Sequence, residues 1–298
     1  VTTVRTDAGT LEARNVVIAT GTFQRPRIPT FSQAISPDVV QLHSSRYRNP
    51  EQLPPGSVLV VGSGQSGCQI AEELNQSGRE VYLCTSGVPR APRRYRGRDF
   101  MWWLVENGFF DRTVDDLPAP AARFTPNQHV IGKDGGHTLK LHQFARDGVI
   151  LLGHMEGADG SKVKMAADLM DNLKAADEAA VKMKQGIDTF IEKIGMDVPE
   201  EDQPPLRDGY DADVITELDL EDAGIRSVIW ATGYRWDYSW IEAPIFDDFG
   251  YPVQERGVTP QEGLYFVGLH WLHTIKSGLL LGVGDDAAHV AREIDSRS

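Results

Sequence analysis

One stretch of the chain, Ser57 to Cys84, constrains the fold more than any other. Its first five residues are mostly β-branched and predict a buried strand, and the hexapeptide Gly62 to Gly67 follows directly. Apolar residues at helical spacing then run to Leu74, and a second strand is predicted over Glu80 to Cys84. A strand, a glycine turn, a helix and a strand within about 30 residues form a β-α-β unit.

The hexapeptide reads G-x-G-x-x-G, and each glycine has a physical role in nucleotide binding. Gly62 permits the tight turn, Gly64 lets the backbone approach a pyrophosphate, and Gly67 lets the helix pack closely on the strand. Free N–H groups at the start of the helix then bind the phosphates. The alternative is a purely structural glycine turn, which the strand-turn-helix-strand context disfavours. The predicted dinucleotide contacts are Gly62, Ser63, Gly64, Gln65, Ser66 and Gly67.

The residues after the second strand indicate which dinucleotide is bound. An NAD site usually carries an acid there, but this strand is followed by Thr85 and Ser86, and no acid occurs before Asp99. Arginines stand instead at 90, 93, 94, 96 and 98. Because arginine forms charge-assisted hydrogen bonds to phosphate, we predict NADPH, with Arg93 and Arg94 on the 2′-phosphate. The alternative is a solvated basic loop or an inter-domain ion-pair patch.

A second feature is a repeated strand ending. The short apolar runs Val16–Ile18 and Ser227–Trp230 both stop at Ala-Thr-Gly, at 19–21 and at 231–233. The carboxyl end of a buried parallel strand opens onto the crevice where ligands sit, and small residues let a cofactor approach the backbone. A single Ala-Thr-Gly could equally be the ordinary end of a strand. Two copies that flank a nucleotide-binding unit instead predict that this backbone lies beside a cofactor. The predicted contacts are Ala19, Thr20, Gly21, Ala231, Thr232 and Gly233.

The composition of the 298 residues, 41% of them hydrophobic, is that of an ordinary globular chain that can hold two domains. The formal charge of −13 argues against nucleic acid or an anionic membrane as the main partner, and no apolar run approaches the roughly 20 residues of a membrane span. Cys68 and Cys84 form no C-x-x-C pair, so no disulfide framework or dithiol centre is expected. No metal site is predicted, a cytoplasmic setting is expected, and a homo-oligomer is compatible with the sequence.

The remaining segments are read from local pattern. We predict a β-meander up to Ile18, with a turn at Asp7-Ala8-Gly9, and helices over Phe100 to Leu104, Met165 to about Ile194 and about Leu279 to Ile294. Strands are expected at Gly148 to Gly153 and Gly263 to Gly268.

Several of these pieces, in this order, resemble the flavin-containing monooxygenases and their bacterial relatives. They are VVIATGTFQRPRIP, LHSSRYRNP, VLVVGSGQSGCQIAEEL, ATGYRWDYSWI and GLYFVGLHWLHTIKSGLLLGVGDDAAHVA. The resemblance covers nearly the whole chain and implies an α/β fold in which a Rossmann-like NADPH domain is inserted in an FAD-binding domain. The implied boundaries are 1–30 and 226–298 for the FAD-binding parts and 31–225 for the NADPH domain.

The resemblance also implies cofactors and chemistry. FAD and NADPH would be bound, with Tyr47 and Gly268 as further cofactor contacts and His43 as the candidate for a catalytic residue. The implied activity is a monooxygenase that uses O₂ to oxygenate a soft nucleophile, a small molecule, through a peroxyflavin. One alternative is a flavin reductase or NADPH oxidase of the same fold. Another is an NADP-binding module without turnover.

Two departures from the family pattern qualify these expectations. In the fingerprint F-x-G-x-x-x-H-x-x-x-(F/Y/W), His43 and Tyr47 fit, but Pro37 and Val39 replace the Phe and Gly. The family also carries an earlier G-x-G-x-x-G for FAD, whereas only 18 residues precede the first Ala-Thr-Gly. We therefore expect this chain to be a fragment of a longer flavoprotein. A relative that binds NADP(H) alone is the less favoured interpretation.

Overall fold

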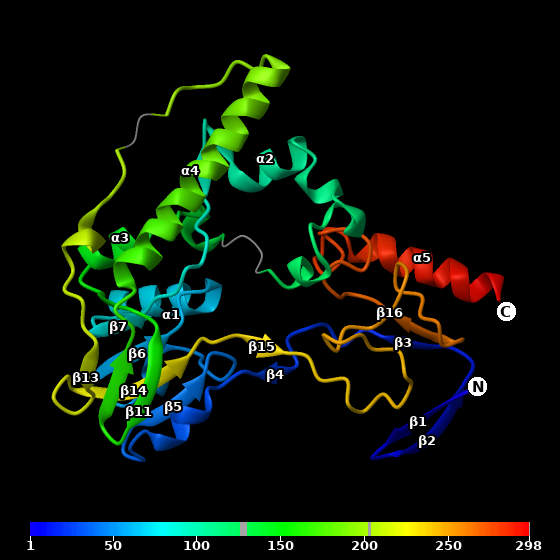
Figure 1. The fold of residues 1–298 in the computed structure, drawn as a ribbon, viewed down its shortest axis with the longest axis horizontal. Coiled ribbons are helices and arrows are strands. Elements are labelled where there is room, and N and C mark those ends of the chain that lie inside the picture. The colour runs from blue at the N-terminus through cyan, green and yellow to red at the C-terminus, as the bar shows by residue number, and fades with distance from the viewer. Residues whose placement is uncertain (126–129, 202–203, 298) are drawn as a thin grey trace. The chain divides into compact units, whose positions relative to one another are not determined.

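The computed structural model describes residues 1–125, 130–201 and 204–297 and divides the chain into two compact units (Figure 1). Unit 1 comprises Val1–Arg25, Leu104–Pro126 and Tyr234–Ser298, and unit 2 comprises Pro26–Trp103 and Asn127–Gly233. Within the described residues, the chain crosses between the units at the short strands β4 (Arg25–Pro26) and β15 (Tyr234–Arg235) and in helix α2 (Phe100–Glu106). This division differs from the predicted one, because 104–126 joins unit 1, while 26–30 and 226–233 join unit 2.

Unit 2 is built on a five-stranded sheet in which every neighbouring pair is parallel. Its order is β10-β7-β6-β14-β5, with β10 (Ile150–Leu152), β7 (Val81–Cys84), β6 (Ser57–Val61), β14 (Ile225–Trp230) and β5 (Val40–His43). All five residues of β6 are buried, as expected for a strand covered on both faces. The predicted Rossmann-like sheet is therefore observed.

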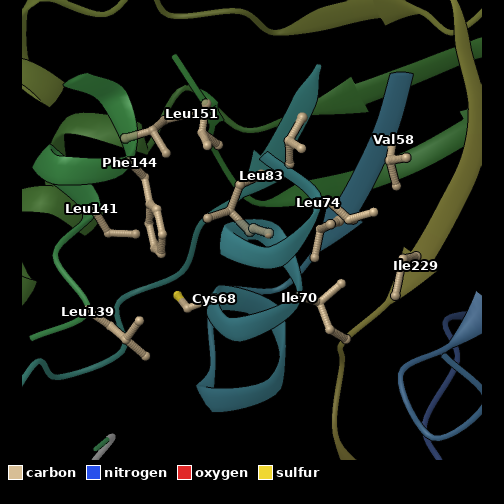
Figure 2. Packing of buried hydrophobic residues seen from close by; sticks show 14 of the residues in the cluster. Val58, Cys68, Ile70, Leu74, Leu83, Leu139, Leu141, Phe144, Leu151 and Ile229 are labelled. Carbon is tan, nitrogen blue, oxygen red and sulfur yellow. The ribbon is translucent and has the colours of Figure 1, made fainter. Parts of the chain in front are cut away.

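Helices cover one face of this sheet: α1 (Gln65–Gln76), α3 (Leu141–Arg146) and α4 (Leu169–Ile194). Val58 of β6 packs with Ile70 and Leu74 of α1 in one cluster (Figure 2), to which Val60 also belongs. Alternation along the strand sends Leu59 to the opposite face. There it meets an antiparallel sheet of β11 (Met155–Asp159), β12 (Lys162–Met165) and β13 (Glu217–Asp219).

The predicted start of the long helix α4 at Met165 is wrong. Residues 162–165 form β12 instead, with alternating exposed and buried side chains, and Met165 donates its N–H to the Thr216 carbonyl. Pairing with a segment about 50 residues away along the chain overrides the local helical pattern there. Asp171 lies in the first turn, Lys193 in the last, and the helix ends at Gly195 with a left-handed φ of 65°.

Unit 1 holds the hairpin β1 (Thr2–Thr6) and β2 (Gly9–Ala13), the parallel pair β3 (Val16–Ile18) and β16 (Leu264–Phe266), and helix α5 (Val283–Ser296). The predicted meander is therefore only a hairpin, because β3 leaves it to pair with β16. Helix α5 begins at Val283, four residues after the predicted start. Residues 104–126 are held in this unit by backbone bonds from Val114 N to His273 O and from Ile275 N to Arg112 O.

Shorter elements complete the described chain. They are β8 (Arg94–Tyr95), β9 (Arg98–Asp99) and the 3₁₀ turns Thr30–Ala34, Pro50–Gln52, Phe109–Asp111, Val114–Asp116, Pro120–Phe124, Lys133–Gly135 and Asp208–Asp211. No helix in the described residues is both long and apolar enough to cross a bilayer.

Candidate cofactor sites

The glycine loop of unit 2 has the geometry that phosphate binding requires. Gly62 has φ of +106°, and a Cβ added to Gly67 would lie 1.8 Å from the Gly62 carbonyl oxygen. A Cβ on Gly64, by contrast, would meet nothing within 4 Å. Gly64 is the N-cap of α1 and provides no side-chain cap, and Ser66 in the first turn is exposed. Two glycines thus permit the turn and its packing, and the third leaves room for a ligand.

Side chains beneath the loop hold it in place. The buried Ser63 hydroxyl accepts a hydrogen bond from Ser86 N at 3.1 Å, joining the loop to the end of β7. Gln65 Nε2 donates to the Val130 carbonyl, while its buried Oε1 has no partner among the described residues. An unpartnered buried amide oxygen beside an open helix N-terminus fits a site that a polar ligand completes. These residues therefore fit a bound dinucleotide.

The cofactor contacts predicted in the segment after β7 differ in their hydrogen-bond and ion-pair partners. Thr85 is buried, and its hydroxyl donates to Leu152 O and accepts from Asn172 Nδ2, so its side chain is engaged within the fold. Arg93 forms an ion pair with Asp99 at 2.8 Å, and Arg94 donates to the Gly135 carbonyl at 2.9 Å. The role of Arg93 and Arg94 at a 2′-phosphate stays a prediction.

Arg90, which sequence reasoning did not place in the site, lies closest to the glycine loop. Its side chain is buried, 5% exposed, and Nη2 donates to the Ser63 carbonyl oxygen. Nε and Nη1 have no hydrogen-bond partner among the described residues. Nothing local distinguishes Arg90 from the other four arginines in the sequence, because burial is decided by contacts with the distant glycine loop.

The second Ala-Thr-Gly lies beside the glycine loop. Ala231 N donates to the Val61 carbonyl at 2.9 Å, and a Cβ on Gly62 would lie 2.7 Å from Ala231 O. The Thr232 hydroxyl donates to the Arg27 carbonyl, and the Gly233 carbonyl accepts from Arg27 N at 2.9 Å. Small residues are needed here because two backbones approach each other closely. The structure thus places this element in unit 2, against the dinucleotide turn.

His43 supports the same element. It is buried at the end of β5, and Nε2 lies 2.9 Å from the Gly233 carbonyl oxygen. Ser45 N donates to Nδ1 at 3.2 Å, so Nδ1 is the acceptor and Nε2 carries the proton. Tyr47, predicted as a cofactor contact, is buried and donates its hydroxyl to Glu73 of α1 at 2.8 Å. Both side chains hold elements of unit 2 together.

The protonation of His43 gives a pH prediction. Burial lowers its pKa below the ordinary 6.5, against a smaller opposing effect of the Gly233 hydrogen bond. Below pH 6.5 the unfolded chain therefore binds a proton that the folded chain does not, and stability falls as the pH falls. We expect His43→Gln to reduce the loss of unfolding free energy between pH 7.5 and 5.5, measured by urea unfolding. The exposed His154→Gln is the control, and an unchanged loss in His43→Gln would contradict the assignment.

In unit 1, β3 and β16 run parallel and end at one edge, where Ala19 and Thr20 are exposed. Gly21 has φ of +65°, and an added Cβ there would meet nothing within 4 Å. Its carbonyl accepts from Gln24 Nε2 and from the Tyr238 hydroxyl, which fixes the turn. Gly268 follows β16 with φ of +80°. Open backbone at the carboxyl ends of two parallel strands fits the edge of a cofactor.

A partly buried histidine flanks this edge. His270 Nε2 lies 3.2 Å from the Thr22 hydroxyl, and burial lowers the pKa of the imidazole. No group of three or more His, Cys, Asp or Glu side chains that could hold a metal ion occurs in the parts of the chain that the structure describes. Each unit thus has an edge with open backbone, the kind of edge at which dinucleotide-binding α/β folds hold a cofactor.

Comparison with known proteins gives the family. Residues 1–104 match the model of the family described as pyridine nucleotide-disulphide oxidoreductase. An uncharacterized CzcO-like oxidoreductase of Geobacillus kaustophilus is 33% identical over 98% of this chain and 67% of its own length. Indole-3-pyruvate monooxygenase YUCCA1 of Oryza sativa subsp. japonica is 40% identical over 98% of this chain and 64% of its own length. The chain thus spans about two thirds of the length of these relatives.

A solved structure agrees on the fold. The flavin-containing monooxygenase from Stenotrophomonas maltophilia superposes with a TM-score of 0.57 at 17% identity, over 99% of this chain and 66% of the other. The chain belongs to the flavin-containing monooxygenase-like family, whose members are flavin-dependent oxidoreductases that use FAD and NADPH.

Proposed function

We propose that the protein is an NADPH-dependent flavin monooxygenase that inserts one atom of O₂ into a soft nucleophilic small molecule. The reaction balances as substrate, O₂, NADPH and a proton giving oxygenated substrate, water and NADP⁺. The carrying observation is the open N-terminus of α1 above a glycine turn, with a second open strand edge at Ala19 and Thr20 in unit 1. Bound NADPH and FAD supply hydride transfer and oxygen activation.

The chain's own residues would bind and orient these groups. The N–H groups at Gln65 and Ser66 lie at the positive end of α1 and would bind the pyrophosphate of NADPH. Arg90 and Ser63 would hold the loop in the shape that admits it. The exposed backbone of Ala19 and Thr20 and the turn at Gly21 would lie along FAD.

The two cysteines of this chain are not suited to disulfide reduction, the chemistry in the name of the matching family. Cys68 and Cys84 are both buried and unpaired with each other. Burial raises the pKa of the Cys84 thiol to about 12 and also raises that of Cys68. Because the thiolate is the reactive species, neither cysteine is a competent redox nucleophile at neutral pH.

The reaction is tested with the protein, FAD, NADPH and ¹⁸O₂, using thioanisole and N,N-dimethylaniline as probe nucleophiles. A monooxygenase yields the sulfoxide or N-oxide with one ¹⁸O atom and consumes one NADPH per product. Stoichiometric H₂O₂ with no labelled product would instead show an NADPH oxidase. NADPH binding without flavin binding would show a binding module.

The dinucleotide site has its own test in Gly64→Val. The backbone at Gly64 is extended (φ −67°, ψ −171°), so valine fits without strain, and the new side chain extends into open space. We expect the Kd for NADPH to rise at least about tenfold, while the unfolding free energy changes by less than about 1 kcal/mol. Gly157→Val in β11 is a matched control, because an added Cβ there also meets nothing within 4 Å. Unchanged NADPH binding in Gly64→Val would refute the phosphate site.

A further inference from the structure

Unit 2 contains a cavity of about 790 Å³ that the glycine loop does not line, although Arg93 and Arg94, the predicted 2′-phosphate contacts, do line it. Its walls come from the loop after β7, the segment before and into α3, one face of α4, and the segment that ends at Arg207. None of the glycine-loop residues Gly62–Gly67 lines it, and neither does Thr85 or Ser86. The volume lies in the range of about 300–1,000 Å³ that is typical of small-molecule pockets.

One wall of the cavity is an apolar stripe on α4. The lining residues of this helix recur at helical spacing and form a single face: Leu173, Ala176, Asp177, Ala180, Val181 and Lys184. Leu141 and Leu206 add apolar surface from other segments. Leu141 and Leu173 belong to the core, whereas Val181 is 52% exposed, so the stripe runs from the interior to the surface. Such a wall suits the apolar body of a ligand.

The charges on the walls are mostly positive, in a chain whose net charge is −13. The cations are Arg90, Arg93, Arg94, Lys140, Lys184 and Arg207, and the acids are Asp177, Glu200 and Glu201. Two of the acids are already engaged, because Asp177 accepts from His142 and Tyr210 and Glu201 accepts from Arg96 N. Six cations thus stand against three acids in the lining, and one of the cations, Arg93, is already paired with Asp99.

Several of these cations have no acidic partner among the described residues. Lys184 lies 5.1 Å from the centre of the Tyr95 ring, and Arg207 lies 5.2 Å from that of Tyr210, but no ion pair involves them or Lys140. Arg90 also lines the cavity, and its Nε and Nη1 are buried with no hydrogen-bond partner among the described residues. A buried guanidinium with unsatisfied donors is costly unless an anion completes it.

We propose that this cavity binds a small organic anion, a carboxylate or sulfonate with an aryl or alkyl body, at a site separate from the dinucleotide, so that Arg93 and Arg94 serve this anion and not the 2′-phosphate. The anionic group would bond to the cations of the wall, and the apolar body would lie along the α4 stripe. This inference does not rest on the proposed oxygenation, because it concerns binding within unit 2 alone.

A pair of fluorescent probes tests the charge requirement. 8-Anilinonaphthalene-1-sulfonate carries the anion, and N-phenyl-1-naphthylamine has the same apolar body without it. We expect the sulfonate to bind the folded chain at one site, at least about tenfold more tightly than the neutral probe, since one charge-assisted hydrogen bond suffices for that difference. Equal affinities for the two probes would overturn the proposal.

Saturating NADPH tests the separateness of the site. We expect the Kd for the sulfonate to change by less than about twofold, because the cavity lining excludes the glycine loop. Displacement of the probe by NADPH would overturn the proposal and would instead support Arg93 and Arg94 as the 2′-phosphate contacts.

Substitutions on α4 locate the site. Lys184→Gln should weaken sulfonate binding about tenfold and leave binding of the neutral probe unchanged. Lys182→Gln, an exposed lysine on the same helix that does not line the cavity, is the matched control. Ala180→Phe should exclude both probes by filling the cavity, with far-UV circular dichroism as the check on folding. Equal effects of Lys184→Gln and Lys182→Gln would overturn the assignment even if Ala180→Phe does not fold.

Discussion

Gly67→Ala is expected to abolish measurable NADPH binding and to destabilise unit 2 by about 3 kcal/mol. The added Cβ would lie 1.8 Å from the Gly62 carbonyl oxygen and 3.2 Å from the Ala231 Cβ, and the nearest of these atoms belongs to the backbone. The helix must therefore move away from the strand, which misplaces the N–H groups of the first turn of α1. We expect the Kd for NADPH to rise at least about 100-fold, measured by isothermal titration.

Gly186→Ala is the control, because it replaces a glycine by alanine without creating a clash. Gly186 lies within α4, where an added Cβ meets nothing within 4 Å, so alanine should stabilise the protein by about 0.5–1 kcal/mol. NADPH binding should be unaffected. Retention of wild-type NADPH affinity in Gly67→Ala would show that the close packing of helix on strand does not shape the site.

Trp230→Ala is expected to cost about 3–5 kcal/mol of unfolding free energy. Trp230 ends the strand β14 between β6 and β5 and is 1% exposed, and its ring centre lies 6.0 Å from that of Phe31. Its Nε1 donates to Gln41 Oε1 at 3.1 Å. Truncation to alanine would remove the packing and the hydrogen bond together and leave a large cavity beneath the sheet.

Two further variants resolve the contributions at Trp230. Trp230→Phe keeps most of the ring volume but leaves Gln41 without its donor, so we expect a smaller cost of about 1–3 kcal/mol. Trp240→Ala is the control, because Trp240 is 55% exposed and its loss should cost less than about 1 kcal/mol. Urea unfolding followed by far-UV circular dichroism measures all three, and a cost for Trp230→Ala as small as that for Trp240→Ala would refute the burial argument.

Local sequence pattern predicted the elements of the unit 2 sheet more completely than any other part of the fold. Strand β6 and helix α1 were predicted because β-branched residues, a glycine turn and a helical apolar stripe follow one another without interruption. The antiparallel sheet β11-β12-β13 was not predicted. Its strands are short, and its third strand lies about 50 residues beyond the second along the chain, so no local pattern joins them. The start of α4 was misplaced for the same reason.

The same difference between local and long-range signals applies to the candidate site. The glycine loop was predicted, since each of its glycines answers a local requirement of backbone geometry. The burial of Arg90 was not predicted, and a catalytic role of His43 stays a prediction. The structure shows His43 bonded to Gly233, which lies 190 residues away in the chain. Whether a polar side chain faces a ligand or another part of the protein depends on partners that are distant in sequence.

Short-range spacing and backbone conformation were enough to predict the β-α-β unit, its glycine turn and the two strands that end at Ala-Thr-Gly. Contacts between distant segments place the second Ala-Thr-Gly against the glycine loop, join 104–126 to unit 1 and bury Arg90. These outcomes depend on long-range strand pairing and packing. A hydrogen bond or a buried contact between residues far apart in the chain leaves no periodic signal in the sequence.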